Sequence, residues 1–153
     1  PVGEVATAPA QPLVRAEATP GRFPIQKARH DKPKFGHCVE VAYPPGEDES
    51  PGPTTMWMKT PPLIEGEVPS PFQLLCPLAD CGNALSRNGE LSEMGFVNPD
   101  LTIVMHRPPM SQWLASQSWS DWNESGIGLA SAIIHDEEGP CATALQTLVL
   151  QRP

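Results

Sequence analysis

The sequence predicts an α+β fold in which an antiparallel sheet packs against a single helix. Two short strand-like segments come first, one helix-like segment follows, and several strand-like runs complete the chain. The later runs are separated by short polar turns, and consecutive strands joined in this way pair antiparallel. At 153 residues, of which 39% are hydrophobic and 18% charged, the chain has the size of one domain with its own core.

Residues 1–24 are rich in Pro and Ala and lack the periodicity of a helix or a strand. We interpret them as a linker or arm, and residues 25–153 as the folded domain. The chain begins with Pro1 rather than Met and shows no signal-peptide pattern. We therefore expect either that its start was removed or that it is part of a longer polypeptide.

Two strand candidates precede the helix. Residues 36–43 alternate around apolar side chains, and residues 54–60 are rich in β-prone side chains. The stretch between them is dense in Pro, Gly and acidic residues, which is typical of a solvated turn. These features predict a pair of short strands.

The helix is predicted over residues 70–85. Ser70 is a favourable N-cap, and Pro71 stands at the first helical position, where its missing N–H loses no hydrogen bond. Pro77 falls inside the helical pattern. A proline there predicts a kink or a later start of the helix.

Strand-like runs cover the rest of the chain. In the first of them Leu101, Ile103 and Met105 share one face. Polar turns separate the runs, which predicts antiparallel neighbours. The runs span residues 96–108, 113–122, 127–136 and 140–152.

Composition and charge exclude several classes of function. The net charge is −8 and the 10 Lys and Arg residues form no cluster, whereas nucleic acids and anionic membranes attract basic surfaces. No apolar run approaches the roughly 20 residues that span a bilayer. The four Cys and four His lack the close spacing of zinc ligands, so we expect no metal and no cofactor. We interpret the cysteines as free buried thiols in a reducing, cytoplasmic compartment.

Asp80 is the one charged side chain of the predicted helix. A helical wheel places it opposite the apolar face. Its neighbours on that side are Gln73, Cys76, Asn83 and Ala84. This side is either plain solvent-exposed surface or a surface covered by a second body. A solvated helix face normally carries Lys and Glu, and their absence favours the second interpretation.

Gln146 and Asn98 are polar residues in otherwise apolar surroundings. Alternation along the last strand puts Gln146 on the inward face with Ala144 and Leu148. That position suits a structural amide bonded to backbone as well as a functional side chain. Asn98 precedes Pro99 and is equally compatible with a turn residue.

Two other catalytic arrangements find little support. The sequence contains no G-x-S-x-G of a serine hydrolase, and no Cys has a recognisable His partner for cysteine hydrolysis.

Trp113, Trp119 and Trp122 suit the lining of a ligand tunnel, although aromatic residues on strands more often pack in a core or an interface.

Four stretches stand in a characteristic order along the chain. They are "PFQLLCPLADCG", "NPDLTIVMHRPP", "QWL" and "GIGLASAIIHDEEGPCATALQTLVL". In this order they resemble the C-terminal half of acyl-CoA thioesterases of the thioesterase II type, the thioesterase-like branch of the hot-dog superfamily. The resemblance covers residues 35–152, which is most of the predicted domain.

The resemblance implies a hot-dog fold, in which an antiparallel sheet wraps one long central helix. It also implies that two hot dogs, from one chain or from two, form the active unit. In this family an Asp on the helix, a Thr or Asn on the next strand and a Gln on the last strand hold the hydrolytic water. By position these are Asp80, Asn98 and Gln146. Arg107 matches a family position with a structural or CoA-facing role.

The expected function is hydrolysis of an acyl-CoA thioester to a free fatty acid and CoA. Asp80 would act as general base, and the two amides would orient the water. We expect the backbone N–H groups of residues 72–75 to stabilise the oxyanion. The expected partners are the acyl-CoA substrate and a second hot-dog domain, as in a dimer or with a missing N-terminal half. The alternative is a hot-dog half that binds acyl groups, or is purely structural, without hydrolysis.

Overall fold

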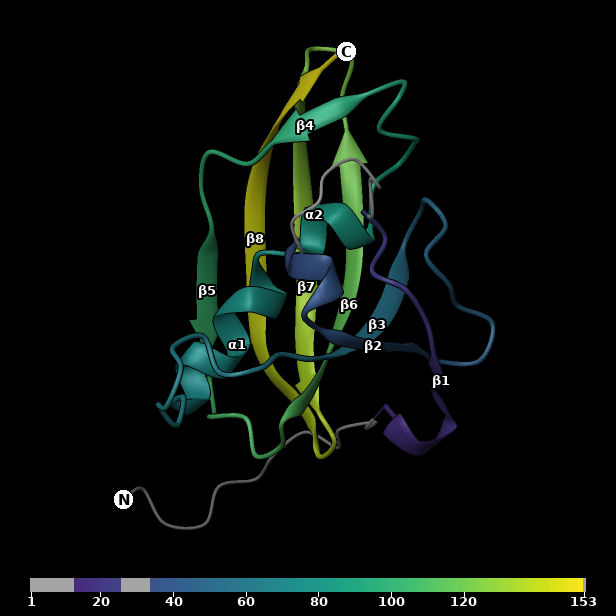
Figure 1. Cartoon of the computed structure of the whole chain (residues 1–153). Coiled ribbons are helices and arrows are strands. Elements are labelled where there is room, and N and C mark those ends of the chain that lie inside the picture. The colour runs from purple at the N-terminus through teal and green to yellow at the C-terminus, as the bar shows by residue number, and fades with distance from the viewer. Residues whose placement is uncertain (1–12, 26–33, 153) are drawn as a thin grey trace, which may run out of the picture.

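The computed structural model describes residues 13–25 and 34–152 (Figure 1). Its strands are β1 (Thr19–Pro20), β2 (Glu40–Tyr43), β3 (Thr54–Lys59), β4 (Gly95–Val97), β5 (Thr102–Met105), β6 (Trp113–Trp122), β7 (Ile127–Asp136) and β8 (Gly139–Gln151). Its helices are α1 (Pro71–Ala79) and α2 (Gly82–Leu85), with the 3-10 turns η1 (Arg15–Glu17) and η2 (Phe35–His37).

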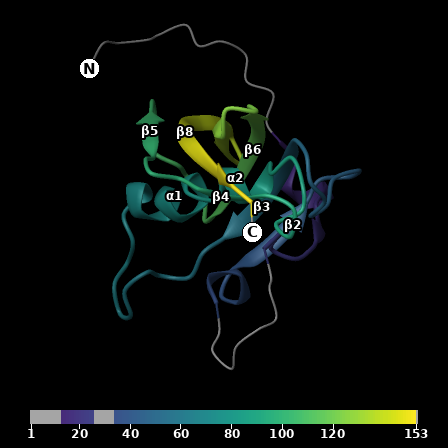
Figure 2. The ribbon, with the colours of Figure 1, turned by 90° about the horizontal axis from the view of Figure 1, so that it is seen from above.

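All of these strands belong to one antiparallel sheet. Their order is β1-β2-β3-β6-β7-β8-β4, and β5 also pairs with β8. The helical segment carries the chain from β3 across one face of the sheet to its far edge, and the sheet curves around that segment (Figure 2). Strands β6, β7 and β8 form the predicted meander. The α+β arrangement predicted from the sequence is therefore confirmed.

The strands β6 and β7 have the predicted bounds, but the run predicted at residues 96–108 is divided into β4 and β5. Pro99 lies in the interruption and has no N–H to give to the sheet. The carboxylate Oδ1 of Asp100 accepts the N–H of Thr147 on β8 at 2.8 Å, in place of a strand carbonyl. The interruption releases Asn98 from the sheet.

The helical segment starts where the sequence predicts. The Oγ of Ser70 accepts the Gln73 N–H at 3.3 Å, and Gln73 Oε1 accepts the Ser70 N–H at 2.7 Å, which closes a capping box. Pro71 occupies the first helical position and Pro77 lies within α1. The proline at position 77 therefore neither delays nor ends the helix.

The segment does not continue unbroken to Leu85. It leaves the α-helical pattern at Asp80 and Cys81, where the Cys81 N–H donates to the Leu78 carbonyl at 3.0 Å in a tighter turn. α2 begins directly afterwards. This break sets the direction of the Asp80 side chain, which a regular helical wheel does not predict.

Both helices pack on the inner face of the sheet. Among the buried apolar side chains of the two layers are Met56, Met58, Leu75, Leu78, Leu85, Leu114 and Ile134. Gly82 approaches the sheet so closely that a methyl group on it would touch Ala132 and Gln146. This close approach brings the backbone of α2 within hydrogen-bonding reach of β8.

Part of the predicted arm covers the outer face of the sheet. Ala18 packs in a small cluster with the fully buried Trp57, and the Arg15 guanidinium lies 3.8 Å from the ring centre of Trp113. The predicted division between residues 24 and 25 stays a prediction, and residues 1–12 lie outside the described residues.

The four cysteines are free thiols, as predicted. Two of them are buried, namely Cys81 and Cys141, whereas Cys38 is exposed and Cys76 is half-buried. Within residues 13–25 and 34–152 no helix is long and apolar enough to span a membrane.

Arg107 and Asp136 form a bidentate ion pair that joins the end of β7 to the segment after β5. The guanidinium donates to both carboxylate oxygens, at 2.6 and 2.7 Å, and also to the carbonyls of Pro140 and Gly139. Burial alone would raise the pKa of Asp136. Its hydrogen bonds, chiefly from Arg107, outweigh that effect and lower the pKa to about 2. These contacts favour the structural role for Arg107.

We predict that Asp136→Asn lowers the free energy of unfolding by about 3 kcal/mol at neutral pH, because Arg107 loses its counter-charge. Because folding lowers the pKa of Asp136, its ionised carboxylate stabilises the fold at pH values above the unfolded-state pKa. This stabilisation is lost when the carboxylate is protonated. The wild type should therefore lose about 2 kcal/mol as the pH falls from about 4 to about 2.

Urea unfolding across this pH range measures both effects. The Asp136→Asn variant should show a weaker pH dependence than the wild type. Asp121→Asn, which changes an exposed carboxylate on β6, is the control and should leave the wild-type dependence in place. An Asp136→Asn variant with the wild-type pH dependence would contradict the assignment.

Candidate active site

Asp80 lies at the break between α1 and α2. Its backbone N–H donates to the carbonyl of Cys76 at 3.1 Å and so ends α1, while its side chain leaves the helical segment. The side chain is exposed in the single chain. The carboxylate therefore lies at the surface of the single chain.

The three residues predicted as a site are brought together. One carboxylate oxygen of Asp80, Oδ1, accepts a hydrogen bond from Asn98 Nδ2 at 3.1 Å and another from Gln146 Nε2 at 3.1 Å. The three side chains come from the helix break, the interruption after β4 and the middle of β8. Two side chains that lie 18 and 66 positions from Asp80 in the sequence thus donate to the same carboxylate oxygen.

Gln146 is buried, with 1% of its surface exposed. Its Nε2 also donates to the Asp80 carbonyl at 3.2 Å, and its Oε1 accepts the Asn83 N–H at 3.2 Å. The sequence left open whether Gln146 is a structural amide or a functional side chain. The structure shows an amide that bonds backbone and also contacts the Asp80 carboxylate.

Asn83 is a fourth member of this cluster, although it was not among the predicted site residues. Its side chain is 7% exposed, and its Nδ2 donates to Asn98 Oδ1 at 3.0 Å. The helical wheel had placed Asn83 on the same side as Asp80. That shared side was the one available signal, and it does not distinguish Asn83 from its neighbours.

The second carboxylate oxygen of Asp80, Oδ2, has no hydrogen bond to any described residue. Charge-assisted bonds from two amides hold Oδ1 in place. The carboxylate therefore presents one fixed oxygen to the protein and one exposed oxygen to whatever approaches from outside.

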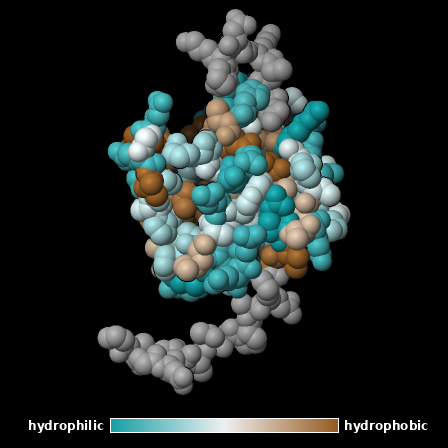
Figure 3. Space-filling model, turned by 60° about the horizontal axis from the view of Figure 1, so that its bottom comes forward, coloured by the Kyte–Doolittle hydropathy of each residue, from teal (hydrophilic) through white to brown (hydrophobic). Residues whose placement is uncertain are grey.

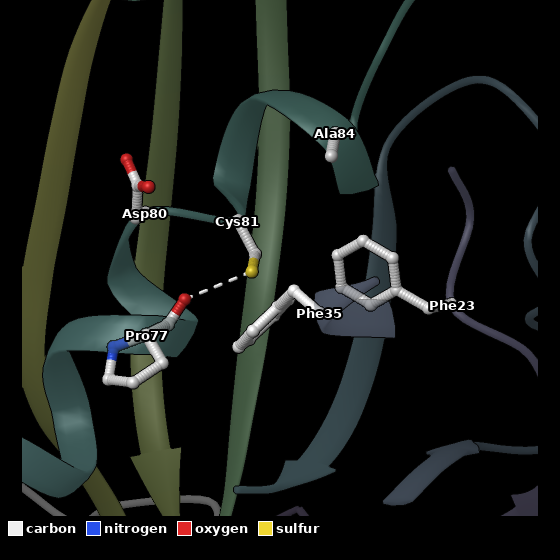
Figure 4. A pocket seen from close by; sticks show the side chains of 6 residues that line it. All are labelled: Phe23, Phe35, Pro77, Asp80, Cys81 and Ala84. Atoms are coloured by element: carbon white, nitrogen blue, oxygen red, sulfur yellow. Dashed lines mark hydrogen bonds between the residues drawn. The ribbon is translucent and has the colours of Figure 1, made fainter. Parts of the chain in front are cut away.

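A cavity of about 310 Å³ opens beside this carboxylate (Figure 4). Apart from Asp80 its lining is apolar or small: Phe23, Phe35, Pro77, Cys81 and Ala84. The two phenylalanine rings meet edge to face, with their centres 5.7 Å apart. Such a lining can accept a hydrocarbon chain and has a carboxylate at its margin.

Cys81 lines the same cavity, but its thiol is not suited to nucleophilic attack. Its Sγ donates to the Pro77 carbonyl at 3.0 Å. Burial, and then the nearby Asp80 charge, raise the pKa of the Cys81 thiol to about 12. The thiol therefore remains protonated at neutral pH, and the thiolate is the reactive form.

The predicted oxyanion donors at residues 72–75 are wrong for Gln73 and Leu74. Their N–H groups donate to Ser70, to its Oγ at 3.3 Å and to its carbonyl at 3.0 Å. They also lie near the start of α1, whereas Asp80 follows its end.

The three tryptophans of β6 do not line this cavity. Trp113 lies beneath Arg15, and the ring centre of Trp122 lies 6.1 Å from that of Phe96. Trp119 is 39% exposed. For Trp113 and Trp122 the structure favours packing over the tunnel lining.

Within the described residues, Cys, His, Asp and Glu form no group of three that could hold a metal ion.

A comparison with family models matches residues 10–150 to the acyl-CoA thioesterase C-terminal domain. No curated protein sequence matches the chain.

Solved structures resemble the chain over most of its length. An acyl-CoA thioesterase II from Mycobacterium marinum is 17% identical with a TM-score of 0.59, and the alignment covers 99% of this chain and 59% of that one. A hot-dog protein of unknown function from Alicyclobacillus acidocaldarius is 16% identical with a TM-score of 0.62, covering 98% and 56%. A thioesterase from Haemophilus influenzae is 15% identical with a TM-score of 0.54, covering 74% and 78%.

These similarities confirm the predicted hot-dog fold. The chain spans little more than half the length of the Mycobacterium and Alicyclobacillus proteins.

Proposed function

The chain belongs to the acyl-CoA thioesterase C-terminal domain family, and we propose that it hydrolyses an acyl-CoA thioester with Asp80 as the general base. The observation that carries this proposal is the contact of both Asn98 and Gln146 with one oxygen of Asp80. This contact leaves the other carboxylate oxygen exposed to bind water.

In the proposed reaction Asp80 takes a proton from a water molecule as the water oxygen bonds to the thioester carbonyl carbon. The tetrahedral intermediate then breaks its C–S bond. CoA leaves as a thiolate and recovers the proton from Asp80, while the acyl group departs as a carboxylic acid. No side chain forms a covalent bond to the substrate.

The two amides serve this chemistry by orientation. Asn98 and Gln146 donate to Oδ1, so that Oδ2 points toward the exterior and the water. A base held in one direction requires little rearrangement in the transition state. The amides thus orient the water through the carboxylate that binds it.

The cavity beside Asp80 is the proposed acyl site. Its lining of Phe23, Phe35, Pro77, Cys81 and Ala84 supports binding of a hydrocarbon chain. A thioester whose acyl chain lies there would have its carbonyl near Asp80. Acyl chain length depends on how far a second body extends this cavity.

A second hot-dog domain is part of the proposal, because Asp80 and its cavity are open in the single chain. The outer edge of β5 pairs with no strand among the described residues. Exposed apolar side chains lie on β5 and before or in α1, namely Leu63, Ile64, Val68, Phe72 and Val104. Hydrophobic groups are also visible at the surface, among hydrophilic ones, in Figure 3.

Pairing along β5 would place the β5 edge of the sheet against another hot dog, from a second copy or from another part of a longer chain.

We also propose a cytoplasmic location for the chain. The alternative function is acyl binding, or a structural role in such a pair, without hydrolysis.

We predict that Asp80→Asn lowers kcat for acyl-CoA hydrolysis by at least about 100-fold, because an amide cannot take a proton from water. Thiol release measures the rate, and circular dichroism checks the fold. Asp121→Asn is the control and should keep full activity. Unchanged turnover in Asp80→Asn would discard the catalytic proposal, and acyl-CoA binding without consumption by the wild type would support the alternative.

We predict that Phe35→Ala raises KM for long-chain acyl-CoA by about 10-fold, because the acyl chain loses apolar contact area. The change should leave kcat nearly unaltered, since the Phe35 ring has no polar group and takes no part in the proton transfer. Val14→Ala removes exposed apolar surface away from the cavity and should change neither constant. Equal KM values for wild type and Phe35→Ala would exclude this cavity as the acyl site.

We predict that the isolated chain forms a dimer and that Val104→Lys shifts it to a monomer, because a charge on an edge strand opposes strand pairing. Sedimentation velocity measures the mass. Ile127→Lys, which charges an exposed residue of β7, should not change it. Equal masses for wild type and Val104→Lys would place the partner elsewhere.

A further inference from the structure

Asn83 contacts two of the three proposed site residues without reaching Asp80. Its backbone N–H donates to Gln146 Oε1 at 3.2 Å, and its side-chain Nδ2 donates to Asn98 Oδ1 at 3.0 Å. Asn83 lies on α2, is 7% exposed, and is held close to the sheet with the rest of that helix. Asn83 thus connects Gln146 and Asn98 through a hydrogen bond to each of them.

The orientation of the Gln146 amide follows from backbone groups. The Asn83 N–H can only donate, and the Asp80 carbonyl can only accept. Gln146 must therefore turn Oε1 toward Asn83 and Nε2 toward Asp80, as observed at 3.2 Å in each case. If the Gln146 amide were flipped, its oxygen would face the Asp80 carbonyl oxygen and its NH₂ group would face the Asn83 N–H. Neither hydrogen bond could then form.

The orientation of the Asn98 amide depends on side chains instead. The ionised Asp80 carboxylate accepts only, so Asn98 must present Nδ2 to it. Asn98 Oδ1 then faces inward and receives the Asn83 Nδ2. The Asn83 donor gives the Asn98 amide a second anchor, so that the side chain cannot swing away from Asp80 without losing a hydrogen bond.

We infer that Asn83 is a positioning residue, which anchors Asn98 Oδ1 and so holds the Asn98 amide where its Nδ2 donates to Asp80. The inference rests on the proposed function, because its catalytic consequence requires Asp80 to be the base. Its backbone N–H contributes to the Gln146 orientation whatever side chain stands at position 83. Side-chain variants of Asn83 therefore test the Asn98 branch of the cluster alone.

The test is a double-mutant cycle on acyl-CoA hydrolysis. Asn98→Ala should lower kcat by about 10-fold with little change in KM, because it leaves the carboxylate with one donor. Asn83→Ala should lower kcat by up to the same factor, because the Asn98 donor is no longer held in place. The double variant should lose no more than Asn98→Ala alone, since Asn83 acts through Asn98. Losses that multiply to about 100-fold would overturn the inference.

Ser86→Ala provides a matched structural control. Ser86 is also buried, stands one residue beyond α2 and hydrogen-bonds another element, Ser120 on β6 at 2.7 Å, but it touches none of the site residues. Its loss should destabilise the fold about as much as Asn83→Ala while preserving kcat. An equal loss of kcat in Ser86→Ala would show that Asn83 matters only for folding.

A spectroscopic readout separates this inference from the proposed function. The side-chain NH₂ signal of Asn98 in a ¹H–¹⁵N spectrum is identified by its absence in Asn98→Ala. It should move in Asn83→Ala and stay in place in Ser86→Ala. An unmoved Asn98 signal in Asn83→Ala would overturn the positioning role. Full activity in Asp80→Asn would instead overturn the proposed function while the signal still reports the contact.

Discussion

The contact between Gln146 and the helix break is the interaction on which the site depends. The buried side chain receives one backbone N–H, from Asn83, and donates to the carbonyl and carboxylate of Asp80. A buried amide without partners costs about 1 to 3 kcal/mol. The last strand and the helix break are therefore held in a single relative position, and the Asp80 carboxylate is positioned as a consequence.

Small residues make that contact possible. A methyl group on Gly82 would already touch Ala132 and Gln146, which shows how closely the backbone of α2 approaches β8. At the edge, the interruption between β4 and β5 frees Asn98 from the ladder, and Asp100 replaces the lost backbone partner of Thr147. Two departures from regular structure, one in the helix and one at the sheet edge, thus converge on Asp80.

The single chain leaves this carboxylate exposed. Electrostatic interactions and hydrogen bonds act more strongly where water is excluded. A partner that covers Asp80 and its cavity would strengthen the contacts already present without having to create them.

Local sequence determined much of the fold. Alternation and polar turns predicted β6 and β7 to the residue, and Ser70 and Pro71 predicted the helix start, because these signals depend on near neighbours in the chain. The residue types of the site followed from a resemblance to a family. Only the tertiary structure decided that Asp80 stands at a helix break, that two amides share one of its oxygens, and that Asn83 joins them. Those facts depend on how closely the helix approaches the sheet, which is set by packing between residues far apart in the sequence.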